Sequence, residues 1–182
     1  MYRALTWKAL SLDLDLEDEG ALSRLARKTK IEIGPTDRVL VDGRDVTRWI
    51  QDSQVEACVS KVAKVAGVRK VLVKQQRELA QNGKVVMAGR DIGTTVLPNA
   101  EVKVYLDATL GERARRRYLE LIERGDAAEY QAVLNDLARR DEIDSERAVS
   151  PLQPAPDARI IDTDGRNAEQ VLSEILAMMV ES

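Results

Sequence analysis

The sequence predicts an α/β fold in which helices cover both faces of a parallel sheet. In its second half, short apolar runs alternate with amphipathic helical patterns, as in βαβ units. Hydrophobic residues make up 44% and charged residues 32% of the 182 residues, which favours one globular core over a disordered chain. The longest apolar runs fall far short of the roughly 20 residues that a membrane helix needs.

Two helices are expected at the start of the chain. Residues 1–12 carry Leu5, Ala9 and Leu12 at helical spacing, with no capping residue before them. Residues 15–30 predict a second helix, for which Asp15 is a suitable N-cap.

A small subdomain of strands and turns follows. Residues 31–34 and 39–41 predict short strands on either side of a turn at 35–37, and Asp42-Gly43 predicts the next turn. Helical patterns then cover residues 47–66, with Thr47 as the expected N-cap, and 68–81. We expect Asp45 and Thr47 to have structural roles.

The second half supplies the strands of the predicted parallel sheet. Buried strands are expected at residues 84–88, 102–106 and 159–162. Helices are expected at 110–124, 129–144 and 167–180, the last opened by a capping box of Asn167 and Gln170, with a proline-rich loop at 151–156.

Composition excludes several kinds of chemistry. The chain has no histidine, which removes Ser-His-Asp and Cys-His nucleophiles and histidine metal sites, and we assign no metal ligand. Chemistry must rely on arginine, lysine, carboxylates and backbone, which favours phosphoryl transfer. The net charge of −3 gives no reason to expect a nucleic-acid polymer or a membrane as partner. The single cysteine, Cys58, and the absence of a basic-then-apolar leader lead us to expect a cytoplasmic protein.

The most informative local motif follows the strand predicted at 84–88. Gly89-Arg90-Asp91-Ile92-Gly93-Thr94 places a cation and an anion between glycines at the carboxyl end of a strand, where open α/β folds bind ligands. The residues alone also allow a plain Arg-Asp ion pair in a turn.

This motif, with residues 96–100 after it, resembles the signature of bacterial cytidylate kinases. Segments in the same order along nearly the whole chain are similar to that family: residues 1–5, 39–47, 60–63, 68–69, 112–118, 140–145 and 147–152. The resemblance implies a nucleoside monophosphate kinase-like domain over residues 1–182. It also implies an inserted CMP-binding subdomain at about 31–82 and a lid at about 110–126.

The resemblance also implies roles for eight residues. Arg3, Arg69 and Arg90 would hold the CMP phosphate, which arginine can bind through two parallel hydrogen bonds. Asp91 would accept a hydrogen bond from the exocyclic amine of cytosine. The residues expected to neutralise charge on the transferring phosphoryl group are Arg140, Arg147, Arg113 and Arg117. Arg115 or Arg116 could serve in place of the last two, and Lys61 has a matching place in the insert.

The sequence departs from the family in one respect. The family begins with a strand and a Gly-x-x-x-x-Gly-Lys-[Ser/Thr] loop, whose amides, lysine and hydroxyl hold the donor phosphates and magnesium. No such motif occurs in the 182 residues. We therefore expect a chain that lacks the first strand and the P-loop, either as a fragment or through a misplaced start, with weak or absent activity.

The expected activity is transfer of the γ-phosphate of ATP to CMP or dCMP with Mg²⁺, by a monomer that acts on small nucleotides. Two alternatives remain open at this stage. The chain could be a non-catalytic protein that binds pyrimidine nucleotides, or another kinase of the same fold, such as an adenylate or shikimate kinase.

Overall fold

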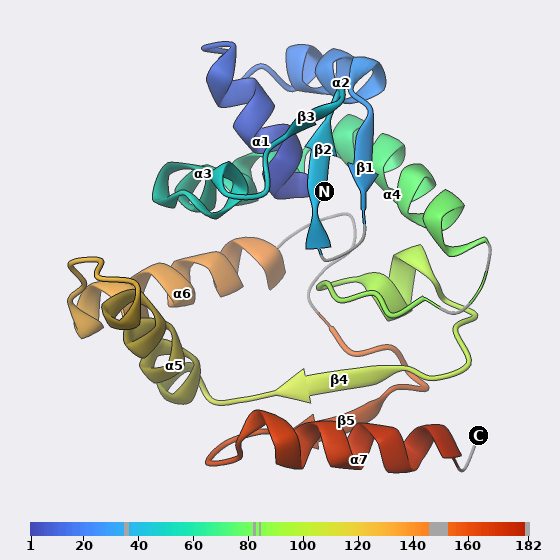
Figure 1. Cartoon of the computed structure of the whole chain (residues 1–182), viewed down its shortest axis with the longest axis vertical. Coiled ribbons are helices and arrows are strands. Elements are labelled where there is room, and N and C mark those ends of the chain that lie inside the picture. Colours follow the sequence, from blue (N-terminus) through green and yellow to red (C-terminus); the bar gives the residue numbers. More distant parts are fainter. Residues whose placement is uncertain (35–36, 82, 84, 146–152, 181–182) are drawn as a thin grey trace. The chain divides into compact units, whose positions relative to one another are not determined.

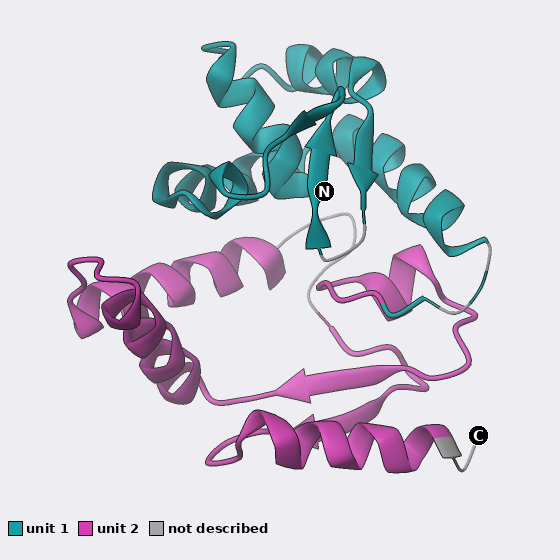
Figure 2. Cartoon of the chain, viewed as in Figure 1, with its two compact units in different colours: residues 1–86 teal, residues 87–182 magenta. Residues whose placement is uncertain are grey.

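The computed structural model describes residues 1–34, 37–81, 83, 85–145 and 153–180. The chain divides into two compact units, Met1–Val86 and Met87–Ser182 (Figure 2). Within the described residues, no helix is both long enough and apolar enough to cross a membrane.

The first unit contains four α-helices, labelled in Figure 1: α1 (Tyr2–Ser11), α2 (Glu19–Lys28), α3 (Ser53–Lys64) and α4 (Ala66–Ala80). Helix α1 packs on α3, and α2 packs on α4. The first predicted helix is confirmed. The second begins four residues later than predicted, because Asp18 rather than Asp15 is its N-cap: the Asp18 carboxylate accepts the Ala21 N–H at 2.8 Å.

A three-stranded antiparallel sheet follows α2 in the sequence and precedes α3. It consists of β1 (Ile31–Ile33), β2 (Val39–Val41) and β3 (Arg44–Asp45), with β2 in the centre. Asp42 and Gly43 join β2 to β3 with φ angles of 50° and 82°, which confirms the turn predicted there. Two residues of the other predicted turn, 35 and 36, lie outside the described residues.

The helix predicted over residues 47–66 is divided into a 3₁₀ turn, η2 (Trp49–Gln51), and α3. The predicted N-cap was wrong. Asp52 caps α3 by accepting the Gln54 N–H at 2.8 Å. Thr47 is engaged elsewhere, because its hydroxyl accepts the Val39 N–H at 3.0 Å and donates to Asp45 at 2.7 Å. Asp45 and Thr47 therefore have the structural role expected of them, because their hydrogen bonds hold β2 and β3 together.

Aliphatic side chains from the four α-helices, from β1 and β2 and from the segments beside them form the core of the first unit. They are Ala4, Leu5, Ala9, Leu22, Ala26, Ile31, Val39, Val41, Val46, Val62, Val65, Val68 and Leu72. The helices α2 and α4 approach closely at Gly67, where an added Cβ would lie 2.8 Å from the Ser23 Cβ. Glycine is therefore needed at this crossing.

The second unit contains η3 (Ile92–Val96), β4 (Val104–Asp107), α5 (Leu110–Glu123), α6 (Tyr130–Ser145), β5 (Arg159–Asp162) and α7 (Ala168–Val180). Strands β4 and β5 are parallel, with Tyr105 opposite Ile160, and α5 packs on α6. The three predicted helices are confirmed, and the capping box is present: Asn167 and Gln170 exchange backbone-to-side-chain hydrogen bonds of 2.9 and 3.0 Å.

The strand predicted at residues 84–88 was wrong. Residue 84 is not described, residues 85–88 have no regular secondary structure, and Val86 is 94% exposed. In the described part of the chain no neighbouring strand offers hydrogen bonds to this segment, and an apolar run forms a strand only with a partner. The described parallel sheet consequently has two strands.

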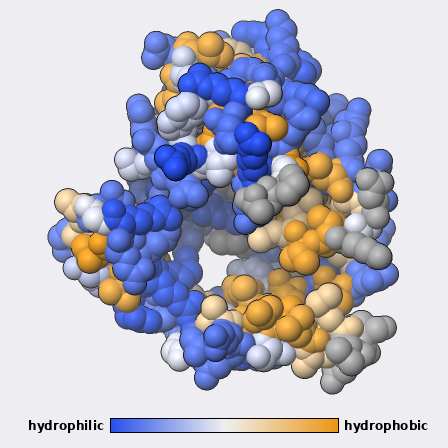
Figure 3. Space-filling view, viewed as in Figure 1, coloured by the Kyte–Doolittle hydropathy of each residue, from blue (hydrophilic) through white to orange (hydrophobic). Residues whose placement is uncertain are grey.

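This small sheet is less buried than the sequence predicts. Apolar residues gather on the surface over α7 and the sheet of the second unit (Figure 3). The exposed ones in these elements are Leu106, Ile160, Leu172, Leu176 and Met179. Ile161, by contrast, is 1% exposed, so β5 has one buried and one open face.

Candidate functional site

Two of the predicted arginines belong to the first unit. Arg3 projects from α1, donates to the Ile50 carbonyl at 3.4 Å and lies 3.4 Å from the Glu56 carboxylate of α3. Arg69 on α4 is 3% exposed, donates to the Ala63 carbonyl at 3.3 Å and lies 5.5 Å from the ring centroid of Tyr2. A guanidinium over an aromatic face is held in one orientation. Arg69 thus contacts Tyr2, the neighbour of Arg3 at the start of α1.

A buried hydroxyl on α3 was not singled out from the sequence. Ser60 is 7% exposed, and its Oγ makes no hydrogen bond in the described part of the chain. A buried hydroxyl without a partner has an energetic cost, and a ligand can remove that cost by hydrogen bonding to it. A serine within an amphipathic helix gives no signal of this kind in a sequence.

Arg90 and Asp91 belong to the second unit. Arg90 forms an ion pair with Asp144, which lies near the end of α6. The Asp144 side chain is 1% exposed. Asp91 is 8% exposed, and its carbonyl accepts the N–H groups of Thr95 and Val96, which starts the π-helical turn η3. Arg90 therefore has a partner beyond the turn in which the motif lies. It is tied to a helix more than 50 residues further along the chain.

Asp144 is a site residue that the sequence did not indicate by itself. It follows Arg140 by one helical turn, so both residues share a face of α6. That spacing is the only feature of the sequence that could have marked Asp144 as a site residue. An acid in a helix rich in arginine and aspartate is, however, normally part of a solvated surface.

The remaining predicted arginines are paired within α5 and α6. Arg113 lies 2.7 Å from Asp141, and the hydrogen bond that it donates to this carboxylate raises the pKa of Arg113. Arg117 lies 2.7 Å from Glu120, and Arg140 lies 2.6 Å from Asp136. Arg147 lies outside the described residues.

Arg115 and Arg116, considered above as substitutes, are held by Glu112. Hydrogen bonds from Arg115 and then Arg116 lower the pKa of Glu112 to about 2. Arg116 also donates to the Thr163 hydroxyl at 3.0 Å and to the Thr163 carbonyl, just beyond β5. Arg116 therefore attaches α5 to the sheet of its unit.

The predicted site arginines of the two units share one electrostatic property. Arg3, Arg90, Arg113, Arg117 and Arg140 each lie against a carboxylate. A phosphate dianion makes the same two-pronged contact with guanidinium and carries more charge than a carboxylate. Paired arginines on an α/β scaffold without histidine are compatible with phosphoryl-group binding and transfer.

Comparison with known proteins specifies the family. The cytidylate kinase family model matches residues 1–181. The chain is 49% identical over 184 residues to the cytidylate kinase of Geobacillus kaustophilus, across 100% of this chain and 82% of the relative. It is 47% identical to that of Bacillus subtilis, across 97% of this chain and 80% of the relative, and 44% identical to that of Carboxydothermus hydrogenoformans, across 98% and 82%. The chain belongs to the cytidylate kinase family, whose members are nucleoside monophosphate kinases.

Proposed function

We propose that the chain is a kinase for CMP and dCMP, which receive the γ-phosphate of ATP by direct in-line transfer. The observation that supports this most is the set of arginines held against replaceable carboxylates. In such a site the incoming phosphate takes the place of an internal carboxylate, so the arginines are already oriented before the nucleotide arrives.

The acceptor nucleotide uses Arg3, Arg69, Arg90 and Asp91 in this proposal. The three guanidinium groups bind the phosphate of CMP, and Asp91 accepts from the cytosine amine, which distinguishes cytosine from uracil. The insert at about 31–82 forms one wall of this acceptor site. Its folded, apolar core in the first unit supports a rigid wall.

The transferring phosphoryl group is neutralised by Arg140, Arg147, Arg113 and Arg117. The segment at about 110–126, which includes α5, acts as a lid and excludes water during transfer. The ion pair of Arg113 with Asp141 supports this role, because it holds a lid arginine in place until a stronger anion competes for it.

The sequence offers less support for a site that binds ATP and Mg²⁺ than for the CMP site. The 182 residues contain no Gly-x-x-x-x-Gly-Lys-[Ser/Thr] run for ATP, and the described residues contain no group of three or more acidic, cysteine or histidine side chains that could hold a metal ion. The residues present therefore do not fit Mg²⁺–ATP by themselves, and we assign no step to the ion. We propose weak or absent kinase activity for the 182-residue chain, with a sheet that lacks a first strand.

A coupled assay for nucleoside diphosphate formation tests the activity. A longer chain, extended upstream to include a P-loop, should phosphorylate CMP and dCMP far faster than UMP or AMP, and the 182-residue chain should be slower. A preference for AMP would overturn the assignment.

The alternative is a non-catalytic protein that binds pyrimidine nucleotides, which the absent donor loop favours. Calorimetry separates the two, since this alternative requires CMP binding that ATP does not change. A monomeric state and a cytoplasmic location also remain proposals, open to light scattering and cell fractionation.

A further inference from the structure

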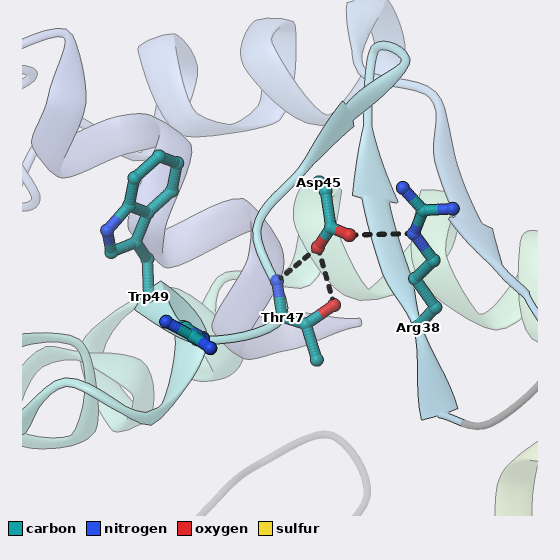
Figure 4. Close-up of a pocket in the computed structure, with 5 residues that line it drawn as sticks. Arg38, Asp45, Thr47 and Trp49 are labelled. Carbon is teal, nitrogen blue, oxygen red and sulfur yellow. Dashed lines mark hydrogen bonds and ion pairs between the residues drawn. The ribbon is translucent and has the colours of Figure 1, made fainter.

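A pocket in the first unit lies outside the predicted acceptor residues. Its volume is about 480 Å³, within the range that holds a mononucleotide, and its lining residues are Arg38, Asp45, Thr47, Arg48 and Trp49. Figure 4 shows Trp49 on one side and the pair of Arg38 and Asp45 on the other, with Thr47 between them. The phosphate-site residues Arg3 and Arg69 do not line it.

One wall of the pocket is made of rigid, polar residues. The Asp45 carboxylate accepts from the Thr47 N–H and hydroxyl at 3.0 and 2.7 Å and from Arg38 Nε at 2.7 Å. These bonds, first those from Thr47 and then that from Arg38, lower the pKa of Asp45 to about 2. Asp45 and Arg38 thus cancel one another in charge and keep their geometry at neutral pH.

The opposite wall carries a flat aromatic surface. The indole rings of Trp7 and Trp49 are parallel within 5°, with centroids 5.7 Å apart, and Trp49 remains 44% exposed. The Arg44 guanidinium lies 4.4 Å from the Trp49 centroid. Arg44 lies over this ring, and the part of the indole that remains exposed is a surface on which a planar ring can stack.

The pocket also has an excess of positive charge. In the part of the chain that the structure describes, neither Arg44 nor Arg48 forms an ion pair, whereas Arg38 is neutralised by Asp45. Arg48 is exposed on the pocket wall and presents an uncompensated guanidinium that can bind phosphate through two hydrogen bonds.

We infer that this pocket, which lies within the insert, is an accessory binding site for a mononucleotide that uses none of the four proposed acceptor residues. The base stacks on Trp49, and Arg48, with Arg44 beside it, binds the phosphate. Neither a bare anion nor an uncharged nucleoside uses both features, so each alone binds more weakly than the two together.

The position of the pocket gives it a way to influence the acceptor residues. Trp49 opens the short helix η2, and the carbonyl of the next residue, Ile50, accepts the hydrogen bond from Arg3. Trp7 lies one helical turn beyond Arg3 on α1. A nucleotide that orders Trp49 therefore also stabilises one orientation of Arg3.

The chain itself supplies the probe for a test. Its two tryptophans are both in the stacked pair, so all of its indole fluorescence comes from Trp49, which lines the pocket, and from Trp7, which stacks on Trp49. Fluorescence titrations of the full chain with GMP, guanosine and inorganic phosphate should show saturable quenching by GMP, with an affinity at least tenfold higher than for the other two ligands. GMP is chosen because the proposed acceptor site is selective for cytosine, so this result does not depend on the kinase assignment.

Variants decide which groups carry the binding. Arg48→Ala should weaken GMP binding at least tenfold, while Arg24→Ala, an exposed arginine of α2 outside the pocket, should leave it unchanged. Trp49→Leu should abolish the heat of GMP binding in calorimetry, and circular dichroism should report a native fold for all three variants. Equal GMP affinity in Arg48→Ala and the unmodified chain would overturn the inference, as would the absence of any GMP-dependent quenching.

Discussion

Arg90 forms an ion pair with Asp144, an acid on α6 whose side chain is almost completely buried. The pair joins the start of the second unit to its longest helix, and it places a motif arginine where a phosphate could displace the carboxylate. Its two members differ in exposure, with 44% for the Arg90 side chain and 1% for Asp144.

Asp144→Asn should destabilise the chain, since it removes the charge that holds Arg90 and leaves a buried amide in its place. We expect a loss of about 1–3 kcal/mol in the free energy of unfolding, below the cost for a fully buried pair because Arg90 is half exposed. Urea unfolding followed by circular dichroism measures it. Glu78→Gln is the control, since both side chains of its ion pair with Lys74 are exposed. An equal loss in both variants would contradict a special role for Asp144.

Arg69→Lys should weaken CMP binding at least tenfold. Lysine keeps the charge, but it cannot bind a phosphate through two parallel hydrogen bonds or lie flat over Tyr2. Isothermal calorimetry with CMP provides the measurement, and Arg77→Lys, on an exposed turn of the same helix, provides the control. Unchanged CMP affinity in Arg69→Lys would remove this residue from the acceptor site.

Gly67→Ala should destabilise the first unit by about 1–3 kcal/mol, because the new methyl group forces α2 and α4 apart at Ser23. Gly20→Ala is a matched control in α2. There the nearest atoms, at the ends of the Arg24 and Asp18 side chains, would both lie 3.2 Å from the new methyl group, so only a small shift is needed. Thermal unfolding compares the two variants, and a smaller effect at Gly67 than at Gly20 would rule out close packing at this crossing.

Thr47→Val should raise the pKa of Asp45 from about 2 toward its usual value of 3.8, because the largest cause of the shift is the hydrogen bond from the Thr47 hydroxyl. A carboxyl whose pKa is lowered by folding stabilises the fold above its unfolded pKa. That contribution disappears as the pH falls through the folded value. In the unmodified chain this loss falls between about pH 4 and pH 2, and in the variant the contribution is smaller throughout.

NMR titration of the side-chain carboxyl carbons measures this pKa directly. Glu112 serves as an internal reference, because its own pKa of about 2 depends on Arg115 and Arg116 and should not change. An Asp45 pKa that stays at about 2 in Thr47→Val would assign the shift to the hydrogen bonds that remain, from the backbone N–H of residue 47 and from Arg38.

Local patterns predicted most of the helices and turns correctly. The Asn167–Gln170 capping box and the Asp42-Gly43 turn each depend on neighbouring residues, which a sequence displays in full. Errors arose where a residue had two suitable roles. Thr47 was available as a cap, but its hydroxyl is used by the Val39 N–H, a partner that only the folded sheet provides.

Features that depend on distant partners were beyond the reach of the sequence. The run at residues 85–88 has the composition of a buried strand, yet a strand requires a neighbour, and composition does not reveal whether one is present. Likewise, the site arginines could be named from a resemblance, but their carboxylate partners could not. The pairing of Arg90 with Asp144 spans 54 positions, and the sequence contains many acids at comparable distances.

The irregular segment around Val86 has a practical consequence for handling the protein. It has no regular secondary structure, the Val86 side chain is almost fully exposed, and the compact units meet along the chain at this residue. Enzymes that cleave after small aliphatic residues require such an accessible, unpaired stretch, which helices deny them. Brief digestion with elastase should therefore nick the chain first near Val86, and storage buffers for this protein should contain serine-protease inhibitors.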